Sequence, residues 1–148
     1  MNTKAVYIFP TLFFFFTIGL FGQTDFYNGS VDELKLKAKN ENKGYIIDFY
    51  TSWCNPCKKM DVEVFQDVSL GQFINDHFLI KKINAEGYQT EKDLAERYFV
   101  NAFPTFIVFD ADGNEQGRLV GYYAKQLFLE KIKKYTHHTP NQQFSDFR

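Results

Sequence analysis

The residues best suited to chemistry are Cys54 and Cys57, the two cysteines of the chain, with Asn55 and Pro56 between them. Because proline is tolerated in the first turn of a helix, this motif predicts a turn that leads into a helix. Two thiols at this spacing can reach disulfide geometry within one helical turn. The pair could therefore carry out thiol–disulfide exchange, in which a thiolate attacks a disulfide sulfur.

The position of each thiol predicts its role. Cys54 lies at the helix start, where unpaired backbone N–H groups and the positive end of the helix dipole stabilise a thiolate. We therefore expect Cys54 to be the exposed nucleophile, with a lowered pKa. Cys57 lies one turn inside the helix, so we expect it to be more buried and to act as the resolving thiol. Lys58 and Lys59 add positive charge nearby.

Two other uses of the cysteine pair remain as alternatives. A zinc site would need His77, His137 or His138 as further ligands, and the last two are adjacent, which is a poor ligand spacing. A purely structural disulfide usually closes a longer loop, because a longer loop constrains the unfolded chain more. The sequence therefore predicts no metal site and favours a chemical use of the thiols.

The first 22 residues have the layout of a secretory signal peptide. One Lys precedes an apolar run, Ala5–Phe21, and Gly22 supplies a small residue at a cleavage point. An uncleaved membrane anchor is the alternative, although the run is at the lower length limit for a span and Pro10 interrupts it. We expect residues 1–22 to be removed and residues 23–148 to be exported, to a periplasmic or extracellular location.

Composition limits the possible classes of protein. The 148 residues suit one domain, and 45% hydrophobic with 24% charged residues is ordinary for a globular protein. The 17 Lys and Arg against 18 Asp and Glu exclude a strongly basic nucleic-acid-binding protein. We expect a monomer that does not bind nucleic acid.

Hydrophobic patterning predicts alternating helices and strands around the dithiol. A capping box, Ser30 to Glu33, begins a helix that ends near Asn42, and the apolar run Tyr45–Thr51 predicts a central strand buried on both faces. Further helices are expected from the dithiol to 64 and at 69–77, 91–98 and 124–135, and further strands at 78–84, 102–109 and 115–120. This order predicts an α/β fold with a core at about 30–135 and a polar tail at 136–148.

These segments carry a resemblance to the thioredoxin family. The segment Asp48–Lys58, DFYTSWCNPCK, resembles its active-site strand and helix, with an acid six residues before the first Cys and a Trp immediately before it. Three further positions match in order: Lys82, which would pair with the buried acid, the Phe103–Pro104 loop, whose proline would be cis and face the dithiol, and Gly121. The resemblance covers roughly residues 30–135. It implies a thioredoxin-like fold, a central mixed β-sheet with helices on both faces.

The resemblance gives the neighbouring residues expected roles. Asp48 would be costly to bury as an unpaired charge, so it is either a core acid paired with Lys82 or a base with a raised pKa that takes the proton from Cys57. We favour the base. A cis Pro104 would leave the Phe103 backbone free to pair with an extended substrate, and Trp53 would form a substrate-facing surface.

The sequence thus predicts an exported thiol–disulfide oxidoreductase that acts on protein thiols or disulfides and needs no cofactor. Pro56 resembles thioredoxin rather than strong oxidants, which favours a reductant, while Asn55 replaces the usual glycine and leaves the redox potential open. A membrane-bound redox partner would recycle the dithiol. The alternative function is a binding module of the same fold, with an inert disulfide and a partner surface at Trp53 and Phe103.

Overall fold

The computed structural model describes residues 22–136, so the predicted signal peptide and the polar tail, with His137 and His138, lie almost wholly outside the described residues. Five helices and four strands are described in this range, and the predicted order of elements is confirmed. The elements are α1 (Val31–Glu41), β1 (Gly44–Tyr50), α2 (Asn55–Glu63), α3 (Val68–His77), β2 (Phe78–Asn84), α4 (Gln89–Arg97), β3 (Thr105–Phe109), β4 (Glu115–Val120) and α5 (Lys125–Lys133).

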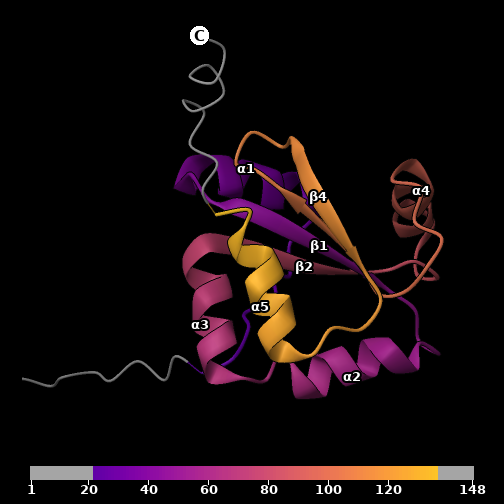
Figure 1. Cartoon of the computed structure of the whole chain (residues 1–148). Helices are drawn as coiled ribbons and strands as arrows, with labels where there is room; N and C mark the ends of the chain where they lie inside the picture. The colour runs from indigo at the N-terminus through magenta and orange to yellow at the C-terminus, as the bar shows by residue number, and fades with distance from the viewer. Residues whose placement is uncertain (1–21, 137–148) are drawn as a thin grey trace, which may run out of the picture.

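The four strands form one mixed sheet in the order β2-β1-β3-β4. β1 and β2 are parallel, whereas β3 is antiparallel to both β1 and β4. Tyr50 therefore lies opposite Asn84 and Phe49 opposite Thr105. The connections that leave β1 and β2 and the one that enters β3 consequently lie at the same end of the sheet (Figure 1). This end carries the dithiol.

Helices cover both faces of the sheet, as the resemblance implied. Ile46 and Ile80 pack on one face against α2, α3 and α5, through side chains such as Met60, Ile74 and Phe128. The other face packs against α1 and α4, and its buried side chains are Leu34, Ala38, Tyr45, Ile47, Phe49, Ile83, Ala95, Ile107 and Phe109. Successive residues of a strand point to opposite faces, so Asp48 shares the α2 face with Ile46.

The start of α1 confirms the capping box. The Ser30 hydroxyl accepts the Glu33 N–H at 3.2 Å, and the Glu33 carboxylate accepts the Ser30 N–H at 2.7 Å. Leu34 and Ala38 are buried, whereas 62% of the Leu36 side chain is exposed, as its position off the apolar stripe indicates. Local capping and periodicity thus suffice to place this helix.

Two predicted elements start more than one residue away from the expected position. β3 begins at Thr105 rather than at Ala102, because the Ala102 carbonyl accepts the Thr105 hydroxyl at 2.8 Å and Pro104 has no N–H to give to a neighbouring strand. α4 begins at Gln89 rather than after a Thr90 cap, since the Glu91 carboxylate accepts the Tyr88 N–H at 3.0 Å. In both cases a side chain forms a hydrogen bond with the backbone three residues earlier in the chain, and this bond sets where the element begins.

Candidate active site

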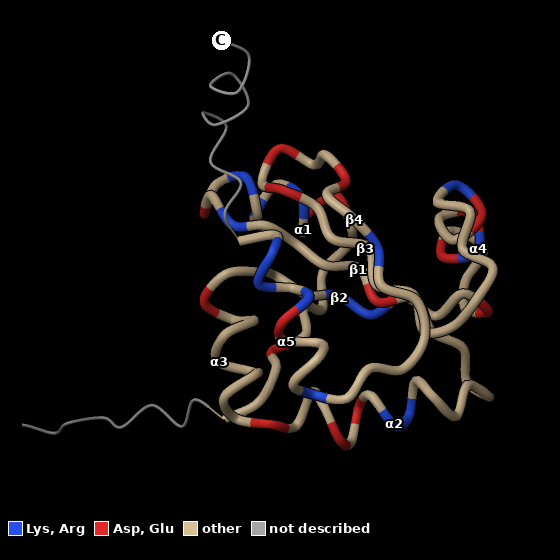
Figure 2. Tube along the Cα trace, viewed as in Figure 1, with Lys and Arg blue, Asp and Glu red and all other residues tan. Residues whose placement is uncertain are grey.

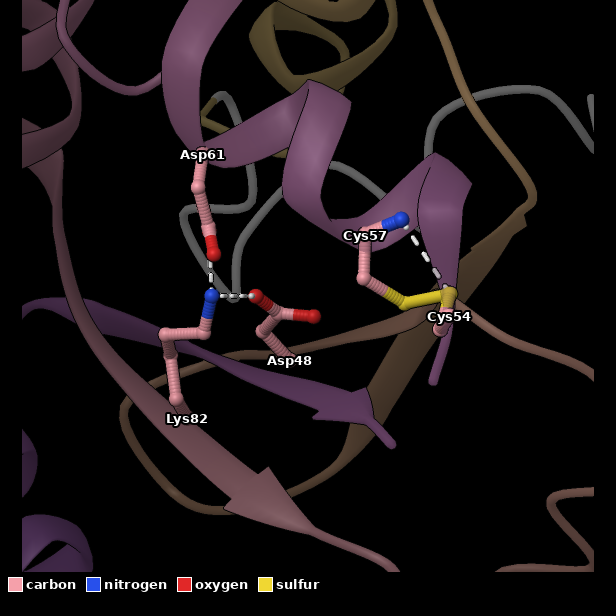
Figure 3. A network of polar contacts seen from close by, with 5 residues as sticks. All are labelled: Asp48, Cys54, Cys57, Asp61 and Lys82. Atoms are coloured by element: carbon pink, nitrogen blue, oxygen red, sulfur yellow. Dashed lines mark hydrogen bonds and ion pairs between the residues drawn. A yellow bond between two sulfur atoms is a disulfide. The ribbon is translucent and has the colours of Figure 1, made fainter. Parts of the chain in front are cut away.

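The dithiol lies at the start of α2, as predicted. Cys54 is the N-cap residue and Pro56 lies in the first turn. The two cysteines form a disulfide with 5.3 Å between their Cα atoms, and the Cys57 N–H donates to the Cys54 sulfur at 3.1 Å (Figure 3). A thiolate on Cys54 would therefore meet a backbone donor and the positive end of the helix dipole.

The predicted difference in exposure between the two cysteines is wrong for the disulfide form. Exposed fractions are 2% for Cys54 and 3% for Cys57. The bond to Cys57 and the hydrogen bond from its N–H hold the Cys54 sulfur against the helix, so the sulfur does not project into solvent. The two thiols are distinguished by their positions in the helix rather than by burial.

Asp48 is buried in β1 beneath α2, with 2% of its surface exposed. Its Oδ1 atom has no hydrogen-bond partner, and Figure 3 shows the carboxyl group between Lys82 and the disulfide. Burial raises the pKa of Asp48 to about 7, and the positive charge of Lys82 opposes part of this rise. A carboxyl with this pKa can gain or lose a proton near neutral pH, as a base for Cys57 requires.

Lys82 lies opposite Asp48 in the strand register, and its Nζ is 3.7 Å from the Asp48 Oδ2. Asp61 of α2 binds the same ammonium group more closely (Figure 3). Sequence reasoning missed Asp61, although its position four residues after Cys57 places it on the same side of the helix. The predicted pair is therefore a group of three charges, in which Lys82 is shared.

The rim of the site is aromatic. The Trp53 side chain is 63% exposed and its ring meets that of Phe103 edge to face, with 6.1 Å between centroids. The Trp53 indole N–H donates to the Glu86 carboxylate at 2.6 Å, and this bond ties the indole ring to the loop that follows β2. Glu86 was not predicted, because a lone acid in a loop carries no local signal.

Pro104 and Gly121 lie next to each other beside Phe103, where the chain enters β3 and leaves β4. The Phe103–Pro104 peptide is cis, as the resemblance implied. The Gly121 N–H donates to the Pro104 carbonyl at 2.8 Å. Gly121 has a φ of +87°, which other residues rarely adopt, and the space where its Cβ would lie is open. Within residues 22–136, no three His, Cys, Asp or Glu side chains lie together in a way that could hold a metal ion.

This geometry agrees with the comparisons with known proteins. A family model described as a thioredoxin-like domain matches residues 31–136. The chain belongs to the thioredoxin-like family. Within the family, the Cys54–Cys57 motif fits the active site, and the chain is built like a thiol–disulfide oxidoreductase.

Several relatives of this thioredoxin-like protein are known. It is 39% identical to a protein disulfide-isomerase of Schizosaccharomyces pombe over 88 residues, 58% of this chain and 23% of the relative. It is 40% identical to the chloroplastic thioredoxin Y of Oryza sativa over 104 residues, 70% of this chain and 56% of the relative. It is 27% identical to the thiol:disulfide interchange protein DsbD of Photorhabdus laumondii over 101 residues, 67% and 18% of the two chains. The chain thus spans between about a fifth and just over half of these relatives.

Solved structures share the fold over most of the thioredoxin-like chain. A candidate disulphide-isomerase from Bacteroides thetaiotaomicron has 30% identity and a TM-score of 0.69, and the match covers 80% of this chain and 97% of that one. A thioredoxin from Thermus thermophilus has 22% identity and a TM-score of 0.68, with 76% and 87% covered. The second likeness supports the fold alone.

Proposed function

We propose that the protein is an exported thiol–disulfide oxidoreductase that reduces disulfides of other proteins. The single observation that carries the proposal is the Cys54–Cys57 disulfide at the start of α2, with the partly paired Asp48 buried beneath it. A binding module would need neither a nucleophile at a helix start nor a costly buried acid next to it.

The proposed reaction has two exchange steps. In the first, the Cys54 thiolate attacks one sulfur of the substrate disulfide, so a mixed disulfide forms and one substrate thiolate leaves and takes a proton. In the second, Cys57 gives its proton to the Asp48 carboxylate and attacks the Cys54 sulfur. The second substrate sulfur leaves as a thiolate and takes up a proton, and Asp48 releases the proton it received from Cys57. The products are the reduced substrate and the Cys54–Cys57 disulfide.

The side chains around the disulfide support distinct roles in this reaction. The Cys57 N–H and the helix dipole stabilise the Cys54 thiolate, and Lys82 limits how far burial raises the pKa of Asp48. Trp53 offers an exposed surface, and the Phe103 backbone, which precedes the first residue of β3, is the proposed pairing site for an extended substrate segment. No organic cofactor takes part in the proposed steps.

Recycling needs two electrons and two protons from a second dithiol, and we infer a membrane-bound redox partner as their source. Export is inferred from the leader-like residues 1–22. In the described part of the chain, no helix is both long and apolar enough to cross a membrane.

A reduction potential measured against glutathione tests the direction of electron flow. Thioredoxin has a reduction potential of about −270 mV, whereas the oxidant DsbA has one of about −120 mV. We expect a value below about −220 mV, together with reduction of insulin disulfides by the reduced protein. A value near the DsbA potential would reverse the proposed direction, and failure to exchange with glutathione at all would favour the inert binding module.

A further inference from the structure

Phe99 is the most exposed large apolar side chain in the described part of the protein, with 85% of its surface accessible. A ring held in water gains none of the stabilisation that burial of apolar surface provides. Core packing therefore does not account for a phenylalanine at this position.

The backbone at Phe99 also disfavours a large side chain. Its φ is +54°, in the left-handed region that glycine adopts most readily. The residue follows the end of α4, where its N–H donates to the Glu96 carbonyl and the Val100 N–H donates to the Ala95 carbonyl, both at 2.9 Å. This pattern of helix termination usually has glycine where Phe99 stands. Neither the exposure to water nor the backbone conformation therefore favours a phenylalanine ring at this position.

The residues on either side hold Phe99 in place. The Tyr98 ring packs against Phe49 and Phe109, with centroid distances of 6.1 and 5.5 Å, and its carbonyl accepts a hydrogen bond from the Arg118 guanidinium. Val100 packs against the core on the α1 and α4 face. The exposed ring is therefore presented by an anchored segment, so contact with a ligand would cost little ordering of the backbone.

This segment leads directly to the rim of the dithiol. Phe99 precedes Phe103 by four residues, so their Cα atoms are at most about 14 Å apart. Figure 1 shows the α4–β3 connection at the end of the sheet from which the chain enters α2. No charged residue occurs between Tyr98 and Phe109, and the connection is uncharged throughout in Figure 2. No charged side chain of this connection therefore separates Phe99 from Phe103 at the rim, and the exposed Asn101 is the polar residue between them.

We propose that Phe99 is a specificity-determining residue that binds an apolar side chain of the substrate polypeptide, three to five residues from the cysteine under attack. The proposal rests on the proposed oxidoreductase function. An extended chain advances about 3.3–3.6 Å per residue, so a peptide placed along Phe103 reaches Phe99 after about four residues. The occupant is the substrate because the segment that carries Phe99 leads within four residues to Phe103, whose ring meets Trp53 at the rim of the proposed exchange site.

The test uses synthetic peptides that form homodimers through one disulfide. Each peptide has Leu or Ser at the third, fourth or fifth position before or after its single Cys. The reduced full-length protein and its Phe99→Gly variant are compared by kcat/KM for release of the peptide thiol. We expect the Leu dimer to be reduced at least about fivefold faster than the Ser dimer at one position, because a buried aromatic anchor contributes at least that much. Phe99→Gly should abolish this advantage.

Three controls separate the role in recognition from a structural one. Glycine suits the left-handed backbone, so Phe99→Gly should melt no lower than the wild type, and Phe99→Asn provides a second tolerated variant. Both should reduce oxidised glutathione at the wild-type rate. Tyr88→Ser removes an aromatic ring that is 82% exposed at the other end of α4, and it should keep the Leu advantage.

The inference would be overturned if the wild type reduced the Leu dimer no faster than the Ser dimer at every position. It would also be overturned if the faster reduction of the Leu dimer persisted in Phe99→Gly, or if Tyr88→Ser lost it to the same extent. Failure of the proposed function has a different signature. In that case the wild-type protein would reduce neither the peptide dimers nor oxidised glutathione.

Discussion

The two faces of the sheet bury different kinds of side chain. The face under α1 and α4 is packed with aliphatic and aromatic residues. On the face under α2, β1 contributes Asp48 and β2 contributes Lys82 beside an otherwise apolar core, and both belong to the group that lies beneath the disulfide (Figure 3). The fold thus places its buried charged groups next to the Cys54–Cys57 disulfide, while the face under α1 and α4 forms an apolar core.

The charged face carries a cost in stability that depends on pH. Burial raises the pKa of Asp48 from 3.8 in the unfolded chain to about 7 in the folded one. The folded protein therefore binds this proton more tightly, and ionising the carboxyl as pH rises from about 4 to above 7 lowers stability, by up to about 4 kcal/mol. Asp48 is the one buried carboxyl among the described residues, and it lies on the α2 face, so disrupting the two faces should have separable effects.

The largest expected effect is that of Cys57→Ser on the α2 face. Cys54 would still attack a substrate disulfide, but nothing would resolve the adduct, so turnover should be lost and mixed disulfides should accumulate. Non-reducing gels and mass spectrometry measure the adduct. Cys54→Ser should accumulate none, and equal trapping by both variants would show that the roles of the cysteines are wrongly assigned.

The second largest effect is expected on stability, from a substitution on the face under α1 and α4, which contributes no residue to the proposed exchange. Leu34 is fully buried under α1, so Leu34→Ala should cost about 2–5 kcal/mol of the free energy of unfolding in denaturant titration. The alkylation rate of Cys54 in the folded protein should not change. Leu36→Ala on the same helix removes a 62% exposed side chain and should stay within about 0.5 kcal/mol of the wild type. A change in alkylation rate would show that the two faces are coupled.

A third prediction concerns Asp48→Asn, which keeps the shape but removes the proton acceptor. Reduction of a protein disulfide should slow by roughly tenfold or more at pH 7, and the rise of the wild-type rate with pH around 7 should flatten. Alkylation of Cys54 should change less, because that step takes no proton from Cys57.

Stability gives an independent readout for the same variant. Asp48→Asn should be more stable than the wild type at pH 8, and this gain should shrink as the pH falls below 7 and be lost below about pH 3.8, where Asp48 becomes protonated in both the folded and the unfolded state. Lys82 keeps Asp61 as its partner, so the substitution does not leave an unpaired buried cation. Unchanged turnover with lower stability would instead identify Asp48 as one half of a core ion pair.

The smallest expected effect is that of Asp61→Asn. The Asp48 carboxyl faces Lys82 on β2, Asp61 and Cys57 on α2, and the uncharged Phe106 on β3. Removing the Asp61 charge frees Lys82 for a closer contact with Asp48, and both changes lower the pKa of Asp48. The pH midpoint of turnover should fall by about one unit.

Glu63→Gln is the matched control for Asp61→Asn. It removes the same charge from α2, at a residue that pairs with Lys59 and Tyr122 rather than with Lys82. Its pH midpoint should equal that of the wild type. An equal fall in both variants would mean that the net charge of the helix, and not the contact with Lys82, sets the pKa of Asp48.

The sequence by itself determined the features that depend on neighbours a few residues apart. The Ser30–Glu33 capping box and the Cys54 cap of α2 both form through hydrogen bonds within about four residues, so the local residue types specify them. Strong apolar periodicity likewise placed β1 and β2 at almost the observed bounds. The resemblance to a known family supplied the pairing of Lys82 with Asp48.

Tertiary structure alone decided which distant side chains meet. Asp61 reaches Lys82 because α2 packs on the face of the sheet to which Lys82 belongs, and Glu86 reaches Trp53 because parallel β1 and β2 end in register. The exposure of Phe99 is likewise decided by how the α4–β3 connection packs against the rest of the chain. Such contacts depend on strand register and on the direction of a helix across a sheet, and no short stretch of residues specifies either.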